Sequence, residues 1–156
     1  MKQIKIIDTT LIREDSKFSF KEKLEIARQL EKLGVDVIEI PEIVNAKTDI
    51  LFVRTVSSFV KNSVISVCAG SSAESIENAA AALSSAKKAR ICIKVPVSPV
   101  GMEYVSHKKA PAMLAWVSEA VKMAKEKAHE VEFCAVDATR AEPDYLKEII
   151  TAAAEA

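Results

Sequence analysis

The sequence predicts an α/β protein built as a parallel (βα)5 unit. Two observations carry this prediction. Five short runs rich in valine and isoleucine recur along the chain, and apolar residues at helical spacing fill the stretches between them. The runs are almost continuously apolar, which is typical of parallel strands covered on both faces. The 156 residues match one domain, and no Pro/Gly/Ser-rich linker divides them, so we expect residues 1–156 to form a single domain.

The expected strands are four to six residues long, and each is followed by polar or turn-forming residues. A strand–helix–strand crossover is right-handed in nearly all proteins, so repeated βα units place the helices outside a parallel sheet. The expected strands are residues 4–7, 35–40, 64–68, 90–95 and 130–135.

The first helix has sequence signals at both ends. Ser19 and Glu22 form a capping box, and Gly34 is a typical helix terminator. Apolar residues at a spacing of four and three connect these signals. A second helix over residues 45–60 has a helical period, but its β-branched residues weaken the prediction.

The later helices carry similar signals. Ser71 and Glu74 repeat the capping box before the third helix. Pro111 opens a fourth helix near its first turn, and Pro143 opens the last one. The final helical pattern reaches the last residue without a capping signal, which we interpret as a truncation within a helix.

Composition excludes several classes of function. Lys plus Arg and Asp plus Glu both number 22, so no net charge attracts nucleic acid or anionic lipid. No apolar run approaches the ~20 residues of a membrane span, and residues 1–10 lack the apolar core of a signal peptide. Three cysteines predict reduced thiols in a cytoplasmic protein rather than a disulfide framework. Three glycines are too few for a glycine-rich phosphate loop.

Two architectures fit this pattern: an open doubly wound sheet, or the first five units of a (βα)8 barrel, that is, a partial TIM barrel. Ligands bind at the carboxyl ends of the strands in both. The side chains expected there are Asp8, Thr9, Thr10, Arg13, Glu14, Glu39, Glu42, Cys68, Ser71, Ser98, Glu103, Tyr104, His107, Asp137, Thr139 and Arg140.

Several of these positions form motifs that resemble the α-isopropylmalate synthase/homocitrate synthase family. This family consists of metal-dependent (βα)8 enzymes related to hydroxymethylglutaryl-CoA lyase. The similarity covers the whole chain but only the first five units of the family's barrel, and the family's C-terminal regulatory domain has no counterpart in it. The motifs are residues 7–11 (IDTTL) with 13–14, 34–39 (GVDVIE), 98–104 (SPVGMEY), 131–133 (VEF) and 137–140 (DATR).

The resemblance implies a site for Claisen condensation of acetyl-CoA with a 2-oxo acid. It assigns Arg13 to polarising the oxo acid and the enolate, and Glu14 to ligating a divalent cation (Mn, Mg or Zn). Glu39 would orient the site, while Ser98 and Thr139 would border the substrate. These roles are physically reasonable, because a hard cation prefers carboxylate oxygen and a guanidinium stabilises a developing oxyanion.

The sequence also departs from the family pattern. Ile12 is inserted before Arg13, and a one-residue shift in extended chain turns a side chain to the opposite face unless a bulge absorbs it. Lys17 stands in the segment that normally carries a substrate-contacting glutamine. Gly70 replaces an arginine, and Val136 replaces a glutamate. The family's His-x-His metal ligands belong to a later strand, so we expect metal binding here to be weak or absent.

Simpler interpretations remain open for the same residues. Arg13 and Glu14 fit a solvated charge pair, and Glu39 fits a capping residue or a partner of a neighbouring helix. Asp8 and Thr10 fit local turn chemistry. The three cysteines fit buried packing, and both histidines fit the surface.

Two functional hypotheses follow. The first is an N-terminal fragment or divergent member of a 2-isopropylmalate/homocitrate-synthase-like acyltransferase, inactive as this chain alone. The second is a non-catalytic half-barrel that serves binding or assembly. Both imply exposed strand edges and an exposed apolar sheet face, so we expect a homo-oligomer.

Overall fold

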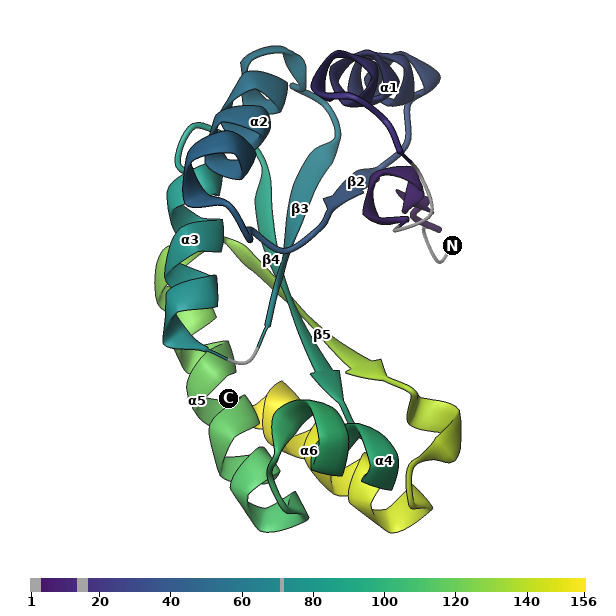
Figure 1. Ribbon diagram of the computed structural model, residues 1–156, viewed down its shortest axis with the longest axis vertical. Coiled ribbons are helices and arrows are strands. Elements are labelled where there is room, and N and C mark those ends of the chain that lie inside the picture. The colour runs from purple at the N-terminus through teal and green to yellow at the C-terminus, as the bar shows by residue number, and fades with distance from the viewer. Residues whose placement is uncertain (1–3, 14–16, 71) are drawn as a thin grey trace.

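Five parallel strands form one sheet whose spatial order is the same as their order along the chain. The computed structural model describes residues 4–13, 17–70 and 72–156. Each strand pairs with the next one in sequence, and the sheet curls between the helices (Figure 1). A doubly wound sheet reverses its strand order, so this topology is that of a partial (βα)8 barrel. The strands are β1 (Ile7–Asp8), β2 (Val37–Ile40), β3 (Val64–Ala69), β4 (Ala89–Pro96) and β5 (Glu130–Val136).

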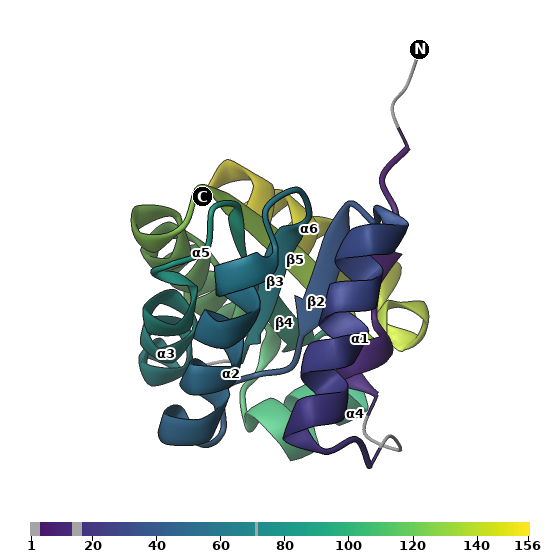
Figure 2. The ribbon, with the colours of Figure 1, turned by 90° about the horizontal axis from the view of Figure 1, so that it is seen from above.

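The long helices pack outside the strands, as repeated βα crossovers require. They are α1 (Phe20–Leu33), α2 (Ala46–Phe59), α3 (Ala73–Leu83), α5 (Ala110–Lys127) and α6 (Pro143–Glu155). Seen from above, α5, α3, α2 and α1 form an arc around the sheet (Figure 2). Over the described residues, no helix is long and apolar enough to span a bilayer.

Short helical turns follow the ends of three strands. The turn η1 (Thr10–Ile12) follows β1, and η3 (Ala138–Arg140) follows β5. After β4 come α4 (Pro99–Gly101) and the π-helix η2 (Met102–Ser106), which the sequence analysis did not predict. The π-helix ends at His107, whose φ of 50° lies in the left-handed region.

The element boundaries confirm most expected segments and correct two of them. The first strand is shorter than expected, because only Ile7 and Asp8 have partner residues in β2. The Ile6 carbonyl accepts from the backbone N–H groups of Asp36 and Val37, but Ile4 to Ile6 are exposed and lie outside the strand. The third helix is capped by Ser72, whose side chain accepts from the Ser75 backbone N–H. Glu74 therefore does not take the third-position role of a capping box. Ser71 lies outside the described residues.

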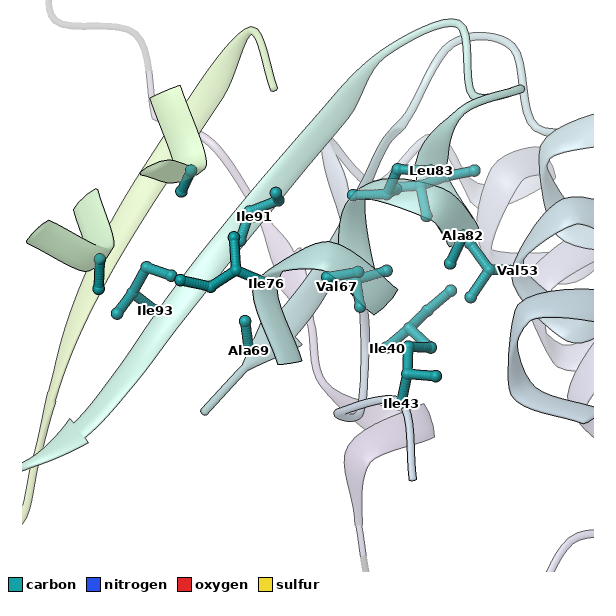
Figure 3. Packing of buried hydrophobic residues seen from close by; sticks show 14 of the residues in the cluster. Ile40, Ile43, Val53, Val67, Ala69, Ile76, Ala82, Leu83, Ile91 and Ile93 are labelled. Atoms are coloured by element: carbon teal, nitrogen blue, oxygen red, sulfur yellow. The ribbon is translucent and has the colours of Figure 1, made fainter. Parts of the chain in front are cut away.

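The hydrophobic core lies between the sheet and the helices. Alternate strand residues, such as Val67 and Ile91, project toward Ile76 and Leu83 of α3 (Figure 3). Because side chains alternate along a strand, every second strand residue belongs to this core. Burying one such isoleucine, leucine or valine contributes about 1.5–3 kcal/mol.

The remaining strand residues face the concave side of the sheet, where charged residues, serine and cysteines make up most of the face and Val37 and Val64 are buried beside them. Arg90 donates from Nη1 to Glu132 (2.8 Å) and from Nε and Nη2 to Glu130 (3.1 and 2.8 Å). The expectation of an exposed apolar sheet face is therefore wrong. The residues of this face include Glu39, Ser66, Cys68, Arg90, Cys92, Lys94, Glu132 and Cys134.

The last turn of α1 holds the loop that leads into β3. One carboxylate oxygen of Glu31 accepts from the backbone N–H groups of Lys61 (2.9 Å) and Asn62 (2.8 Å), and the other accepts from that of Ser63 (3.1 Å). Partial burial acts to raise the pKa of Glu31, but these hydrogen bonds outweigh it and lower the pKa to about 2.

We expect Glu31→Gln to destabilise the fold by about 1–3 kcal/mol at neutral pH, because a charged acceptor of backbone N–H groups is lost. The depressed pKa stabilises the folded state fully above the unfolded value near 4.5, and this contribution disappears as pH falls toward 2. Urea unfolding at several pH values measures the difference. Glu25→Gln on the same helix is the control, because that carboxylate bonds only to Gln29 among the described residues. A difference between the wild type and Glu31→Gln that is independent of pH would contradict the assignment.

Candidate functional site

Arg13, Ser98 and Thr139, three of the predicted site residues, lie in segments that follow the ends of strands at one rim of the sheet. Because β1 to β5 run parallel, the segments that follow them emerge at the same edge. Arg13 follows η1, Ser98 caps α4, and Thr139 lies in η3. Arg13 and Thr139 are exposed, and Ser98 is buried. Glu14, the expected metal ligand, lies outside the described residues.

The segment before Arg13 is a turn rather than an extended strand. Asp8 accepts from the backbone N–H of Thr10 (2.9 Å) and from its hydroxyl (3.1 Å), which confirms the turn chemistry expected for these residues. Leu11 is buried and anchors η1 to the core. The inserted Ile12 is the last residue of this 3-10 turn. The direction of the Arg13 side chain is therefore not set by the alternation of side chains along an extended strand.

Glu39 is part of a polar cluster on the concave face. Its Oε1 lies 2.8 Å from the Lys94 ammonium and accepts from the Cys68 thiol at 3.3 Å. The Glu39 side chain is 11% exposed and that of Lys94 is 29% exposed. Lys94 belongs to β4, so the interpretation of Glu39 as a partner of a neighbouring helix is wrong.

The polar cluster and its burial shift the pKa values of Lys94 and of two nearby cysteines. Burial acts to lower the pKa of Lys94, but the hydrogen bond to Glu39 and the electrostatic interactions with Cys68 and Glu39 together outweigh burial and leave the pKa of Lys94 raised. A hydrogen bond with Cys68, followed by burial, raises the pKa of the Cys92 thiol. Burial likewise raises the pKa of Cys134. These effects favour an ammonium at Lys94 and neutral thiols at Cys92 and Cys134.

Lys94 is not among the residues predicted from the sequence, although a signal for it is present. Arg90, Cys92 and Lys94 occupy every second position of a strand that is otherwise apolar. This spacing indicates one polar face. The packing interpretation of the cysteines is confirmed for the two buried thiols, Cys68 and Cys92, while Cys134 is half-buried and all three are free. His107 and His129 are exposed, as expected.

Ser98 and Asp137 organise the rim after β4 and β5. The Ser98 hydroxyl accepts from the Gly101 backbone N–H at 3.1 Å. Asp137 has a φ of 63° and accepts from Arg140 Nε at 2.7 and 2.9 Å. The contact with Arg140, followed by a hydrogen bond to Ser98, lowers the pKa of Asp137. These bonds hold the turn that carries Thr139.

The lack of a side chain at Gly70, directly after β3, leaves room for the side chain of Glu42, which follows β2. A Cβ there would lie 2.7 Å from a carboxylate oxygen of Glu42. The same carboxylate accepts from the Ser75 hydroxyl at 2.5 Å, and that hydroxyl accepts from the Gly70 backbone N–H at 2.8 Å. The position where the family pattern has an arginine is therefore occupied by the Glu42 side chain.

The described side chains do not form a metal centre by themselves. Within residues 4–13, 17–70 and 72–156, no group of three or more His, Cys, Asp or Glu side chains converges to hold an ion. Glu39 is neutralised by an ammonium instead.

Comparison with known proteins gives consistent matches over the whole chain. A family model described as HMGL-like matches residues 3–156. The 2-isopropylmalate synthase of Heliobacterium modesticaldum is 38% identical over 159 residues, which are 99% of this chain and 31% of that protein. The enzyme of Shouchella clausii is 37% identical over 161 residues, or 100% and 31%. The chain thus spans about a third of the length of these relatives.

We expect Lys94→Met to cost about 1–3 kcal/mol in stability, because it leaves the Glu39 carboxylate buried without its cation. The raised pKa of Lys94 means that the ion pair stabilises the fold throughout neutral pH and is lost only as pH rises through that raised pKa. Urea unfolding of both single variants and of Glu39→Gln/Lys94→Met gives the coupling between them.

Lys127→Met is the matched control, because Lys127 pairs with Glu77 at the same 2.8 Å but Glu77 is 60% exposed. We expect it to cost less than about 1 kcal/mol. Equal effects of the two lysine substitutions, or strictly additive effects at Glu39 and Lys94, would contradict the buried pair.

We expect Gly70→Ala to destabilise the protein by about 0.5–1.5 kcal/mol, because the new Cβ displaces Glu42 from Ser75. In a Glu42→Ala background the same substitution should be neutral or stabilising by up to about 1 kcal/mol, since alanine restricts the unfolded chain. Thermal unfolding of the four proteins tests this reversal. An equal cost in both backgrounds would show that Glu42 does not set the requirement for glycine.

Proposed function

The chain belongs to the HMGL-like family, and on that premise we propose that it is the N-terminal barrel part of a 2-isopropylmalate/homocitrate-synthase-like acyltransferase. The parent reaction would join the methyl carbon of acetyl-CoA to the keto carbon of a 2-oxo acid and release CoA by hydrolysis. The observation that carries the proposal is the match of the whole chain to the N-terminal region of 2-isopropylmalate synthases. We place the protein in the cytoplasm.

The rim residues have distinct roles in this proposal. Arg13 would bind the keto oxygen and stabilise the oxyanion that develops there. Ser98 and Thr139 would border the oxo acid, and Glu39 would orient the site from the concave face. Glu14 would ligate the divalent cation of the parent enzyme, Mn, Mg or Zn, which would act as a Lewis acid.

We propose that this chain alone has little or no activity. Glu39 is engaged by Lys94, and the Ser98 hydroxyl is engaged by Gly101. Among the described side chains no donor set is ready for a metal. A cation held by Glu14 without such donors would be bound weakly.

A non-catalytic half-barrel that serves binding or assembly is the second candidate. The ion pair of Lys94 with Glu39 favours the non-catalytic module, because the two charges of this pair satisfy each other on the concave face. At two positions of the family pattern, Gly70 and Val136 also lack the functional groups that arginine and glutamate would supply.

We expect no free thiol above background when the chain is incubated with acetyl-CoA, a panel of 2-oxo acids and Mn²⁺, Mg²⁺ or Zn²⁺. Thiol release is followed with a chromogenic disulfide. Metal-dependent release that Arg13→Gln abolishes and Arg54→Gln retains would refute the proposed inactivity, because Arg54 lies on α2, away from the rim.

Ligand binding separates the two candidates. In ¹H–¹⁵N spectra, an oxo acid should shift the amide signals of Thr139 and Arg140 in the acyltransferase part, and Arg13→Gln should weaken these shifts. An unchanged spectrum with every oxo acid would favour the non-catalytic module.

A further inference from the structure

The curled sheet has two free edges, and both belong to strands that run in the same direction. Strand β5 pairs with β4 from Glu130 to Val136 and has no strand on its other side among the described residues. At the opposite edge, β1 pairs only with β2. A (βα)8 barrel closes when eight parallel strands form a ring, so three more parallel strands are needed to join β5 to β1. The two edges are therefore the two sides of a single gap in a barrel.

The backbone of β5 presents a row of hydrogen-bonding groups to this gap. The Val136 carbonyl accepts from the backbone N–H of Val97, which directly follows β4. In a strand, the N–H and C=O of one residue point to the same side and those of the next residue point to the other side. Val131, Phe133 and Ala135 therefore direct their backbone groups to the free edge. Such a row of groups is a template for a further strand.

Apolar side chains of β5 are only half covered beside the gap. Ile91 and Ile93 of β4 are fully buried. Their register partners in β5, Val131 and Phe133, are half-buried and border a cavity of about 300 Å³ that residues of α6 also line. The cover over β5 is therefore less complete than the cover over its neighbour β4.

Helix α1 has a similarly incomplete cover on the other side of the gap. Ile26 and Leu30 pack against the core but remain half-buried, and Leu33 is 77% exposed. The helices follow the sheet from α1 to α6, and within the described part of the chain no helix closes the ring between these two (Figure 1). In a complete barrel the helices form a closed outer ring, so both ends of this arc lack a neighbour.

We propose that this gap is the docking surface for a second polypeptide that carries three βα units of the same family. Three units supply the number of strands that the gap lacks, whereas a second copy of this chain would bring five and exceed a barrel of eight. The 2-isopropylmalate synthase of Heliobacterium modesticaldum supports this occupant, because it extends well beyond the 31% of its length that this chain matches. The inference rests on the barrel part assigned in the proposed function, and it concerns assembly rather than catalysis.

Co-expression tests the proposal. The added polypeptide is the segment of the Heliobacterium modesticaldum enzyme that directly follows the matched region, roughly 100 residues for three units. We expect a 1:1 complex in size-exclusion chromatography with light scattering. In this complex, hydrogen exchange at the amides of Val131, Phe133 and Ala135 should be at least about tenfold slower than in the free chain. The matched segment of the same enzyme is the control, because it repeats the five units already present and should not form this complex.

Two substitutions test whether the contact lies at the gap. Ala135→Pro removes an N–H at the free edge, where a sheet tolerates proline, and Leu33→Glu places a charge in the contact of α1. We expect each of them to weaken the complex at least about tenfold. Leu51→Glu is the matched control, because Leu51 is also an exposed leucine but belongs to α2, which lies between α1 and α3 (Figure 2). Circular dichroism of the free chains verifies that the variants are folded.

Several outcomes would overturn the proposal. One is the absence of a complex with the added segment, and another is a complex in which the three β5 amides exchange as fast as in the free chain. A dimer of this chain alone that protects the same amides would assign the gap to a second copy instead. A complex that forms without releasing thiol from acetyl-CoA would support the docking surface and count against the proposed acyltransferase, so the two proposals can fail separately.

Discussion

The alternation of side chains along five parallel strands is the constraint on which the rest of this structure depends. One set of strand residues packs against the helices, and the other set faces the concave side. Because consecutive strands are also neighbours in space, each set forms a continuous surface across the sheet. The apolar set becomes the core, and the polar set brings Glu39, Cys68 and Lys94 together although they lie on three different strands.

The polar set of strand residues gives the concave face its ion pairs. At the amino end Arg90 binds two glutamates, and further along Lys94 neutralises Glu39. Glu39 is largely removed from water, so its charge is stable only as part of a pair, and losing Lys94 would cost more than the pair contributes. The charged residues of this face are therefore paired with one another, which is consistent with a barrel part that needs further groups before it can do chemistry.

Much of this organisation is predictable from local sequence signals. The capping box of Ser19 and Glu22 and the terminating Gly34 set the ends of α1, and the apolar runs locate all five strands. The short α4 and the π-helix after β4 were not predictable, because the left-handed conformation of His107 and the buried position of Ser98 come from packing at the rim. The first strand was predicted too long, since pairing with β2 limits it to Ile7 and Asp8.

The sequence by itself determined the order of the βα units, the apolar periodicity that makes a parallel sheet, and the motifs that identify the family. The periodicity alone could not choose between a doubly wound sheet and a partial barrel, because it does not encode which strand becomes the neighbour of which. The resemblance of the motifs predicted the partial barrel, and the strand order confirms it. Only the tertiary structure decided that order. It also decided that Lys94 faces Glu39 and that Glu42 occupies the space above Gly70. Each of these facts joins residues from separate segments, and such contacts exist only once the chain has folded.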